Sequence, residues 1–202
     1  MFKIIGLLLC FNFLYSANEK FIELIDDKNY SEVEQILKNK LNPNFKTEDD
    51  EVPLIEAVDN DDLKMVKILV KYNANLNIDD GDETPLINAV ENNNSKIVNF
   101  LLQKGANIDK FIKNWNPLLK AAYNNNFYML KLLVTNGANI NVENKYGGTA
   151  LMMACKNGNL EMVKFLVKHH ININKTNIFG KKAIDIAKQN NYPKIVKFLK
   201  GF

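Results

Sequence analysis

The sequence predicts an all-α protein, a solenoid of stacked helix-turn-helix units with a projecting turn or hairpin, here called a finger, before each unit. Three observations predict it. Similar segments recur at a step of 32 or 33 residues. The four clearest segments open with a capping residue, a proline or both, and their second helices end in a column of Asn, Gly or His where left-handed backbone conformation is expected. A repeat of this period is typical of short helical pairs stacked in line.

The repeats align without gaps over four stretches, residues 52–77, 84–109, 116–141 and 149–174. A fainter copy, 21–44, precedes them, and a truncated copy, 182–202, follows, which gives six units. Two columns show the register: Pro53, Pro85, Pro117 and Ala150 in one, and Val66, Val98, Leu130 and Val163 in the other.

Each unit contains the signals of two helices. Thr84, Asn116 and Thr149 are suited to accept a hydrogen bond from a free amide of the first turn, and a proline often follows where no amide is needed. The second helix ends at a column in which a positive φ is expected, occupied by Asn73, Gly105, Gly137 and His170. A pair this small buries its apolar face only by stacking on its neighbours.

Two stretches resemble the ankyrin repeat: Thr84-Pro85-Leu86-Ile87-Asn88-Ala89, and Leu101-Leu102-Gln103-Lys104-Gly105-Ala106-Asn107. The resemblance covers roughly residues 19–202. It implies a non-catalytic protein that grips a partner protein on a concave face of fingers and first helices. The family often has histidine in a column that here holds Ile55, Ile87, Leu119, Met152 and Asp185. This departure puts the hydrogen-bond network between units in question and favours apolar contact.

The register predicts the domain boundaries. Residues 18–48 are expected to form a degenerate N-terminal capping repeat, and 179–202 a truncated C-terminal capping repeat. The ankyrin repeats between them are predicted at 49–80, 81–112, 113–145 and 146–178.

Residues 1–17 have the layout of a secretory signal peptide: Lys3, an apolar run over 4–11, and the small residues Ser16 and Ala17. Two alternatives remain open, a lipid attached at Cys10 and an apolar helix that caps the fold. Cleavage predicts an exported protein, periplasmic, cell-surface or secreted, with Cys155 as its only thiol.

The residues offer no catalytic site, cofactor site or metal site, so we expect no enzyme and no small-molecule substrate. His169 and His170 have no cysteine or clustered carboxylate beside them, and Cys155 lies in a small-residue column. The Gly147-Gly148 pair lacks the lysine that follows a phosphate-binding loop, and residues 79–83 resemble a calcium loop only loosely.

The resemblance implies that finger residues and late first-helix residues contact the partner. Trp and Tyr are enriched among the residues that dominate interfaces, so Trp115 and Tyr123 are the first candidates. The alternative for Trp115 is that it folds back over the neighbouring finger. The predicted apolar strip is Ile112, Trp115, Tyr123, Tyr146 and Phe179, and the predicted charged positions are Glu51, Glu83, Glu91, Lys113, Lys145 and Lys181.

Charge divides along the chain. Residues 18–109 contain 10 lysines and 20 acidic residues, a net charge of −10, and residues 110–202 contain 15 lysines and 3 acidic residues, +12. Such a field steers a partner of complementary pattern. The alternative function is docking of the basic half to an anionic membrane surface or nucleic acid, which the acidic half and the complete absence of arginine argue against. A monomer is expected.

Overall fold

The computed structural model describes residues 17–202, so the predicted signal peptide and the possible lipid site at Cys10 lie outside the described residues, apart from Ala17. The chain divides into two compact units, which we treat separately: unit 1 ends at Ala106 and unit 2 is Asn107–Phe202. Over residues 17–202 the regular structure is helical, with isolated bridges in place of strands, which confirms the all-α prediction.

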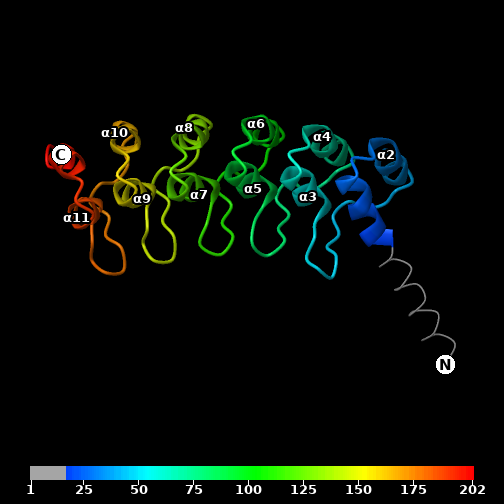
Figure 1. The fold of residues 1–202 in the computed structure, drawn as a ribbon, viewed down its shortest axis with the longest axis horizontal. Helices are drawn as coiled ribbons and strands as arrows, with labels where there is room; N and C mark the ends of the chain where they lie inside the picture. The colour runs from blue at the N-terminus through cyan, green and yellow to red at the C-terminus, as the bar shows by residue number, and fades with distance from the viewer. Residues whose placement is uncertain (1–16) are drawn as a thin grey trace, which may run out of the picture. The chain divides into compact units, whose positions relative to one another are not determined.

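Unit 1 begins with a helix over residues 17–26 and continues with α2 (Tyr30–Lys38). Two helical pairs follow: α3 (Pro53–Asp59) with α4 (Leu63–Lys71), and α5 (Pro85–Glu91) with α6 (Ser95–Gln103). Helix α3 packs against α5, and α4 contacts both α2 and α6. Within the unit, first helices form one layer and second helices another, and the fingers extend beyond the first helices (Figure 1).

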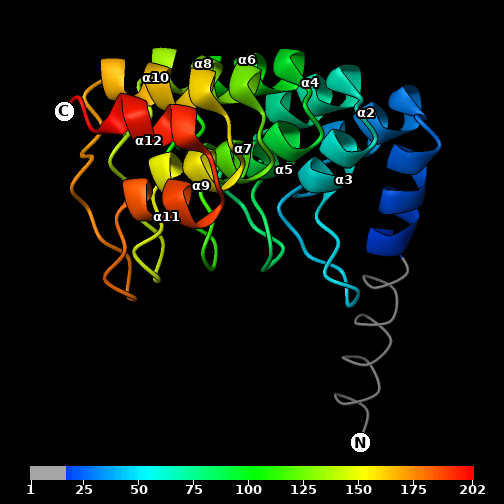
Figure 2. The ribbon, with the colours of Figure 1, turned by 60° about the vertical axis from the view of Figure 1, so that its left-hand side comes forward.

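Unit 2 contains three pairs built in the same way: α7 (Pro117–Tyr123) with α8 (Phe127–Thr135), α9 (Ala150–Lys156) with α10 (Leu160–Lys168), and α11 (Ala183–Gln189) with α12 (Pro193–Leu199). Helix α9 lies between α7 and α11, and α10 contacts α12 (Figure 2).

The predicted caps are confirmed. The side-chain oxygens of Thr84, Asn116 and Thr149 accept from backbone amides three residues on, at 3.2, 2.9 and 3.3 Å. The predicted left-handed column is confirmed as well, with φ of 65° at Asn73, 92° at Gly105, 89° at Gly137 and 62° at His170. These bonds and turns fix where each helix begins and ends, because they satisfy amides and carbonyls that the helix itself leaves free.

The core repeats in columns. Val66, Val98, Leu130 and Val163 are fully buried, and so are Ile87 and Leu119 in the column where the family often has histidine. The expected apolar contact at that column is therefore present. Its last member, Asp185, instead accepts from the backbone amide of Lys182 at 3.2 Å at the start of α11.

Asparagine side chains supply hydrogen bonds between neighbouring repeats. In unit 1, the Asn88 amide donates to Asp59 at 2.9 Å and Asn94 donates to Asp61 at 3.0 Å. In unit 2, the Asn157 amide donates to the carbonyl of Ala122 at 3.0 Å. Hydrogen bonding between repeats is thus retained without the family's histidine.

Candidate functional site

The finger that carries Trp115 is closed by two backbone hydrogen bonds. Ile112 and Trp115 each donate an amide to the other's carbonyl, both at 2.9 Å. Lys113, inside the turn, has a φ of 53°. The reciprocal pair holds the backbone of the finger in one conformation and so determines the direction from which the Trp115 side chain leaves it.

Trp115 packs on Tyr123, the last residue of α7. Their ring centroids are 4.8 Å apart with the planes tilted by 55°, and the Lys120 ammonium lies 5.8 Å from the Trp115 ring. Trp115 is half-buried, whereas Tyr123 is 52% exposed. The contact joins the finger to the first helix of the same repeat and leaves the tyrosine ring open to solvent.

The next two fingers of unit 2 are held by asparagines within their turns. Asn144 Oδ1 accepts from the amides of Tyr146 and Gly148, at 3.0 and 2.8 Å, and Asn177 Oδ1 accepts from Phe179 and Lys181, both at 3.0 Å. These bonds satisfy backbone amides of both turns and support the turn conformations that carry the side chains at their tips.

A hydrogen bond joins these two fingers, from the Ile178 amide to the Tyr146 carbonyl at 3.0 Å. Tyr146 is 48% exposed, Ile178 60% and Phe179 75%. Ile178 was missing from the predicted strip; its signal was its place beside Phe179 at a variable finger position. We call the following set of unit 2 residues the finger strip: Ile112, Trp115, Tyr123, Tyr146, Ile178 and Phe179.

Lysines accompany the finger strip. The Lys145 ammonium lies 5.0 Å from the Tyr146 ring, Lys113 is exposed in the Trp115 finger, and Lys181 is half-buried at the base of the Phe179 finger. A cation over an aromatic ring is attracted by the ring's quadrupole, so the finger strip places positive charge directly beside apolar side chains.

The predicted acidic positions all lie on unit 1. Glu51 is half-buried, and its amide donates to Thr47 Oγ1 at 3.0 Å within a finger. Glu83 is half-buried in the next finger, where its amide donates to Asp80 Oδ1 at 2.8 Å, and Glu91 is exposed at the end of α5.

Sequence reasoning missed Glu56, on α3. Burial, together with the carboxylates of Asp59, Glu51, Asp26 and Asp80, raises the pKa of Glu56 from 4.5 to about 7. These carboxylates come from the ends of two helices, α3 and the helix over residues 17–26, and from two fingers, so no local spacing shows that they converge. Together these carboxylates give the surface of unit 1 around Glu56 a concentrated negative potential.

The cysteine and histidine that the sequence offered as candidates for chemistry pack against other parts of the protein. Cys155 is fully buried, and burial raises the pKa of its thiol to about 12, far from the range of a nucleophile. The His169 ring lies 4.2 Å from the Phe165 ring. Within residues 17–202, no three His, Cys, Asp or Glu side chains group as metal ligands, and no helix has the length and apolar character required to span a bilayer.

Comparison with protein families agrees with the columns and the fold. A family model described as ankyrin repeats (3 copies) matches residues 22–112 and 118–201. This chain belongs to the ankyrin repeat family. A second model, ankyrin repeats (many copies), matches residues 96–134, which include the Trp115 finger. Ankyrin repeats are generally protein–protein interaction modules, and proteins built from them are typically non-catalytic. Comparison with curated proteins gives no match.

Proposed function

We propose that this ankyrin repeat protein is a non-catalytic binding module whose finger strip contacts a partner protein. The observation that carries the proposal is the Trp115–Tyr123 pair, in which a tryptophan on a hydrogen-bonded finger packs on a half-exposed tyrosine. Interfaces concentrate their binding energy in a few such residues.

Contacts within the chain support the conformation of the finger strip. Backbone bonds close the Trp115 finger, asparagines hold the Tyr146 and Phe179 fingers, and the ring contact restrains both Trp115 and Tyr123. Ordering mobile side chains and loops subtracts from binding energy, so a surface already in place retains more of its contact energy as affinity.

The lysines beside the finger strip indicate what kind of partner segment would bind there. Lys113, Lys120, Lys145 and Lys181 belong to the fingers and to α7, alongside the strip. A partner segment with an apolar or aromatic centre and carboxylates at its edges complements this arrangement. Such charges chiefly raise the rate of encounter, and added salt weakens their effect.

The test compares two tyrosines of similar exposure. Tyr123 on α7 is 52% exposed, and Tyr128 on α8, a second helix, is 56% exposed. With the partner isolated by affinity capture, Trp115→Ala together with Tyr123→Ala should weaken binding by about 2 kcal/mol or more, measured calorimetrically. Tyr128→Ala should leave affinity unchanged. Equal affinities for the double variant and the parent protein would remove the proposal.

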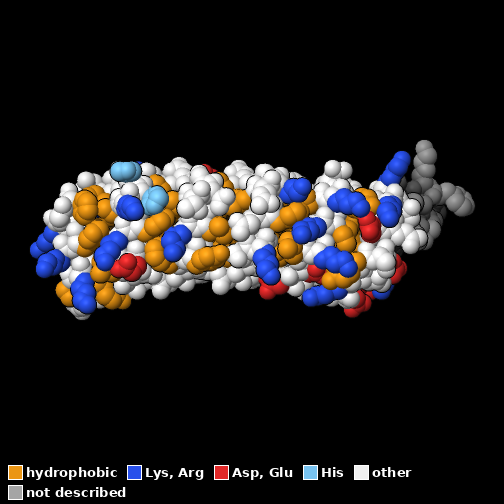
Figure 3. Space-filling model, turned by 90° about the horizontal axis from the view of Figure 1, so that it is seen from above, with side chains coloured by type: hydrophobic (Ala, Val, Ile, Leu, Met, Phe, Trp, Pro, Cys, Tyr) orange, Lys and Arg blue, Asp and Glu red, His pale blue; other side chains and the backbone are white. Residues whose placement is uncertain are grey.

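A second candidate function follows from the excess of lysine in residues 110–202, which contain 15 lysines and only 3 acidic residues. It is electrostatic docking to an anionic membrane surface or nucleic acid. Figure 3 looks onto the second helices, where the lysines of unit 2 are scattered among other side chains rather than gathered into one patch. Titration with anionic vesicles and with an oligonucleotide, each over a salt series, separates this candidate from protein binding.

We also propose export, with cleavage after residue 17 rather than lipid attachment at Cys10. Support comes from the layout of residues 1–17 alone. Mass spectrometry of the mature N-terminus in the native host tests it: a chain that begins at Asn18 supports cleavage, and a lipidated cysteine at the N-terminus contradicts it.

A further inference from the structure

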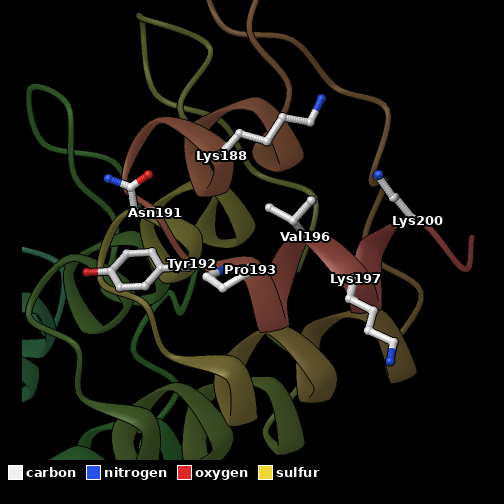
Figure 4. Close-up of a pocket in the computed structure, with 7 residues that line it drawn as sticks. All are labelled: Lys188, Asn191, Tyr192, Pro193, Val196, Lys197 and Lys200. Carbon is white, nitrogen blue, oxygen red and sulfur yellow. The ribbon is translucent and has the colours of Figure 1, made fainter.

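A hollow of 540 Å³ lies on the face of the last helical pair of unit 2. Its lining includes three lysines, Lys188, Lys197 and Lys200, around Tyr192, Pro193 and Val196, and none of the residues that line it is acidic. Figure 4 shows Val196 between the lysines of α11 and α12, with the Tyr192–Pro193 step beside it. Among residues 17–202, no further helical pair packs on this face.

The same face in the preceding repeat is a stacking surface. A step of 33 residues relates Cys155 to Lys188, Val163 to Val196, and Val167 to Lys200. Cys155 and Val163 are fully buried in a repeat whose helices α9 and α10 contact α11 and α12. The last pair therefore keeps the central valine of a stacking surface but carries lysines at two of the columns around it.

Tyr192 lines the hollow and packs on the preceding repeat. Its ring lies directly against Gly158, where a Cβ would come within 2.5 Å of the ring. Asn94, Asn126 and Asn159 cap their helices through the side chain at the equivalent position, whereas Tyr192 makes no such bond. The repeat thus has a packed aromatic ring where its neighbours have a capping side chain.

We propose that this hollow is a docking site for an acidic amphipathic helix of a partner protein. Shape favours a helix, because the equivalent face of the preceding repeat packs against helices. Charge favours carboxylates: Lys188 contacts Asp185 at 3.1 Å, and no side chain within residues 17–202 forms an ion pair with Lys197 or Lys200. An apolar residue of the incoming helix covers Val196 and Tyr192, and acidic residues on either side of it meet the lysines.

This site is separate from the finger strip and does not rest on the function proposed for it. A bilayer fits the hollow less well, because Val196 is half-buried between exposed lysines and a flat surface would meet the ammonium groups first. The membrane and a second copy of this chain are therefore outcomes of the test.

The test uses methyl and aromatic NMR spectra of the full chain, titrated with a stabilised helical peptide of about 15 residues that has a leucine stripe flanked by glutamates. Signals of Val196 and Tyr192 should shift and saturate. Lys197→Gln with Lys200→Gln should weaken binding about tenfold or more, and a peptide with glutamine in place of glutamate should bind more weakly by a similar factor. The matched control is Lys194→Gln with Lys131→Gln, two exposed lysines outside the hollow, which should leave the affinity unchanged.

Four results would overturn the inference. They are equal weakening by the control pair; shifts confined to Trp115 and Tyr123; binding of anionic vesicles that depends on Lys197 and Lys200; and self-association of the chain that depends on them. Shifts confined to Trp115 and Tyr123 would leave the function proposed for the finger strip standing, and Trp115→Ala would leave binding in the hollow intact, so the two proposals fail separately.

Discussion

Asn116 offers a test of the register between repeats. Its side chain is fully buried and caps α7 by accepting from the Leu119 amide at 2.9 Å. The other end of that side chain, Nδ2, has no hydrogen-bond partner among the described residues. Thr84 and Thr149 cap the equivalent helices without carrying an amide group. Replacing Asn116 with threonine should therefore retain the cap and remove a buried donor that has no partner.

The magnitude follows from two opposing contributions. A buried donor without a partner costs about 1–3 kcal/mol, and threonine caps a helix slightly less well than asparagine, by a few tenths of a kcal/mol. The threonine bonds at 3.2 and 3.3 Å are longer than the asparagine bond, in agreement with that small loss. Asn116→Thr should raise the free energy of unfolding by about 1 kcal/mol. The reverse change in unit 1, Thr84→Asn, introduces the unpartnered amide and should lower it by a similar amount.

Urea denaturation measures both changes. Circular dichroism follows the helices, and the fluorescence of Trp115, the only tryptophan, follows the region next to Asn116. Asn116→Thr should move the fluorescence midpoint to higher urea. A loss of stability for Asn116→Thr, or no effect for Thr84→Asn, would show that the columns are not equivalent and would refute the reasoning.

Three further predictions concern Glu56, Cys155 and Gly147. Because the Glu56 carboxyl has a pKa of about 7 when folded and 4.5 when unfolded, the folded state holds an extra proton between these two values. Urea midpoints should therefore show unit 1 losing about 1 kcal/mol of stability, after discounting for solvent screening, as pH rises from 4.5 through 7. Glu56→Gln should remove this pH dependence, and an unchanged dependence would contradict the assignment. Cys155 should resist a thiol reagent at pH 8 until the protein unfolds, as checked by peptide mapping, and complete labelling of the native protein would contradict its burial. Gly147→Ala places a Cβ 2.9 Å from the Asn177 Cα at a φ of 69°. It should destabilise unit 2 by about 1–2 kcal/mol and shift the amide resonance of Ile178. The control, Gly137→Ala, has open space around the new Cβ and should leave the Ile178 resonance in place.

The sequence was sufficient to predict the helical pairs because their signals are local. Capping at Thr84 and Asn116 depends on residues three apart, and the left-handed turn at Gly105 depends on one residue. The apolar columns then predicted the stacking, since each short pair must cover its neighbour.

Contacts that depend on side-chain conformation, or on the register of neighbouring repeats, could not be predicted from the sequence. Sequence reasoning placed Trp115 on a finger and Tyr123 late in the first helix, but their ring contact depends on how the Ile112–Trp115 turn closes. The missing histidine had put the hydrogen bonds between repeats in question. Asparagine side chains at other columns supply such bonds, for example from Asn157 to the Ala122 carbonyl. The role of the finger strip in binding stays a prediction.

Photo-crosslinking from the finger strip tests that role most directly. A photoreactive phenylalanine is placed at position 123, and separately at position 128 on α8 as the control of similar exposure. We predict a single covalent partner adduct from position 123, lost with Trp115→Ala, and none from position 128. Adducts of equal yield from both positions, or an adduct from position 128 alone, would contradict the assignment of the binding surface to the finger strip.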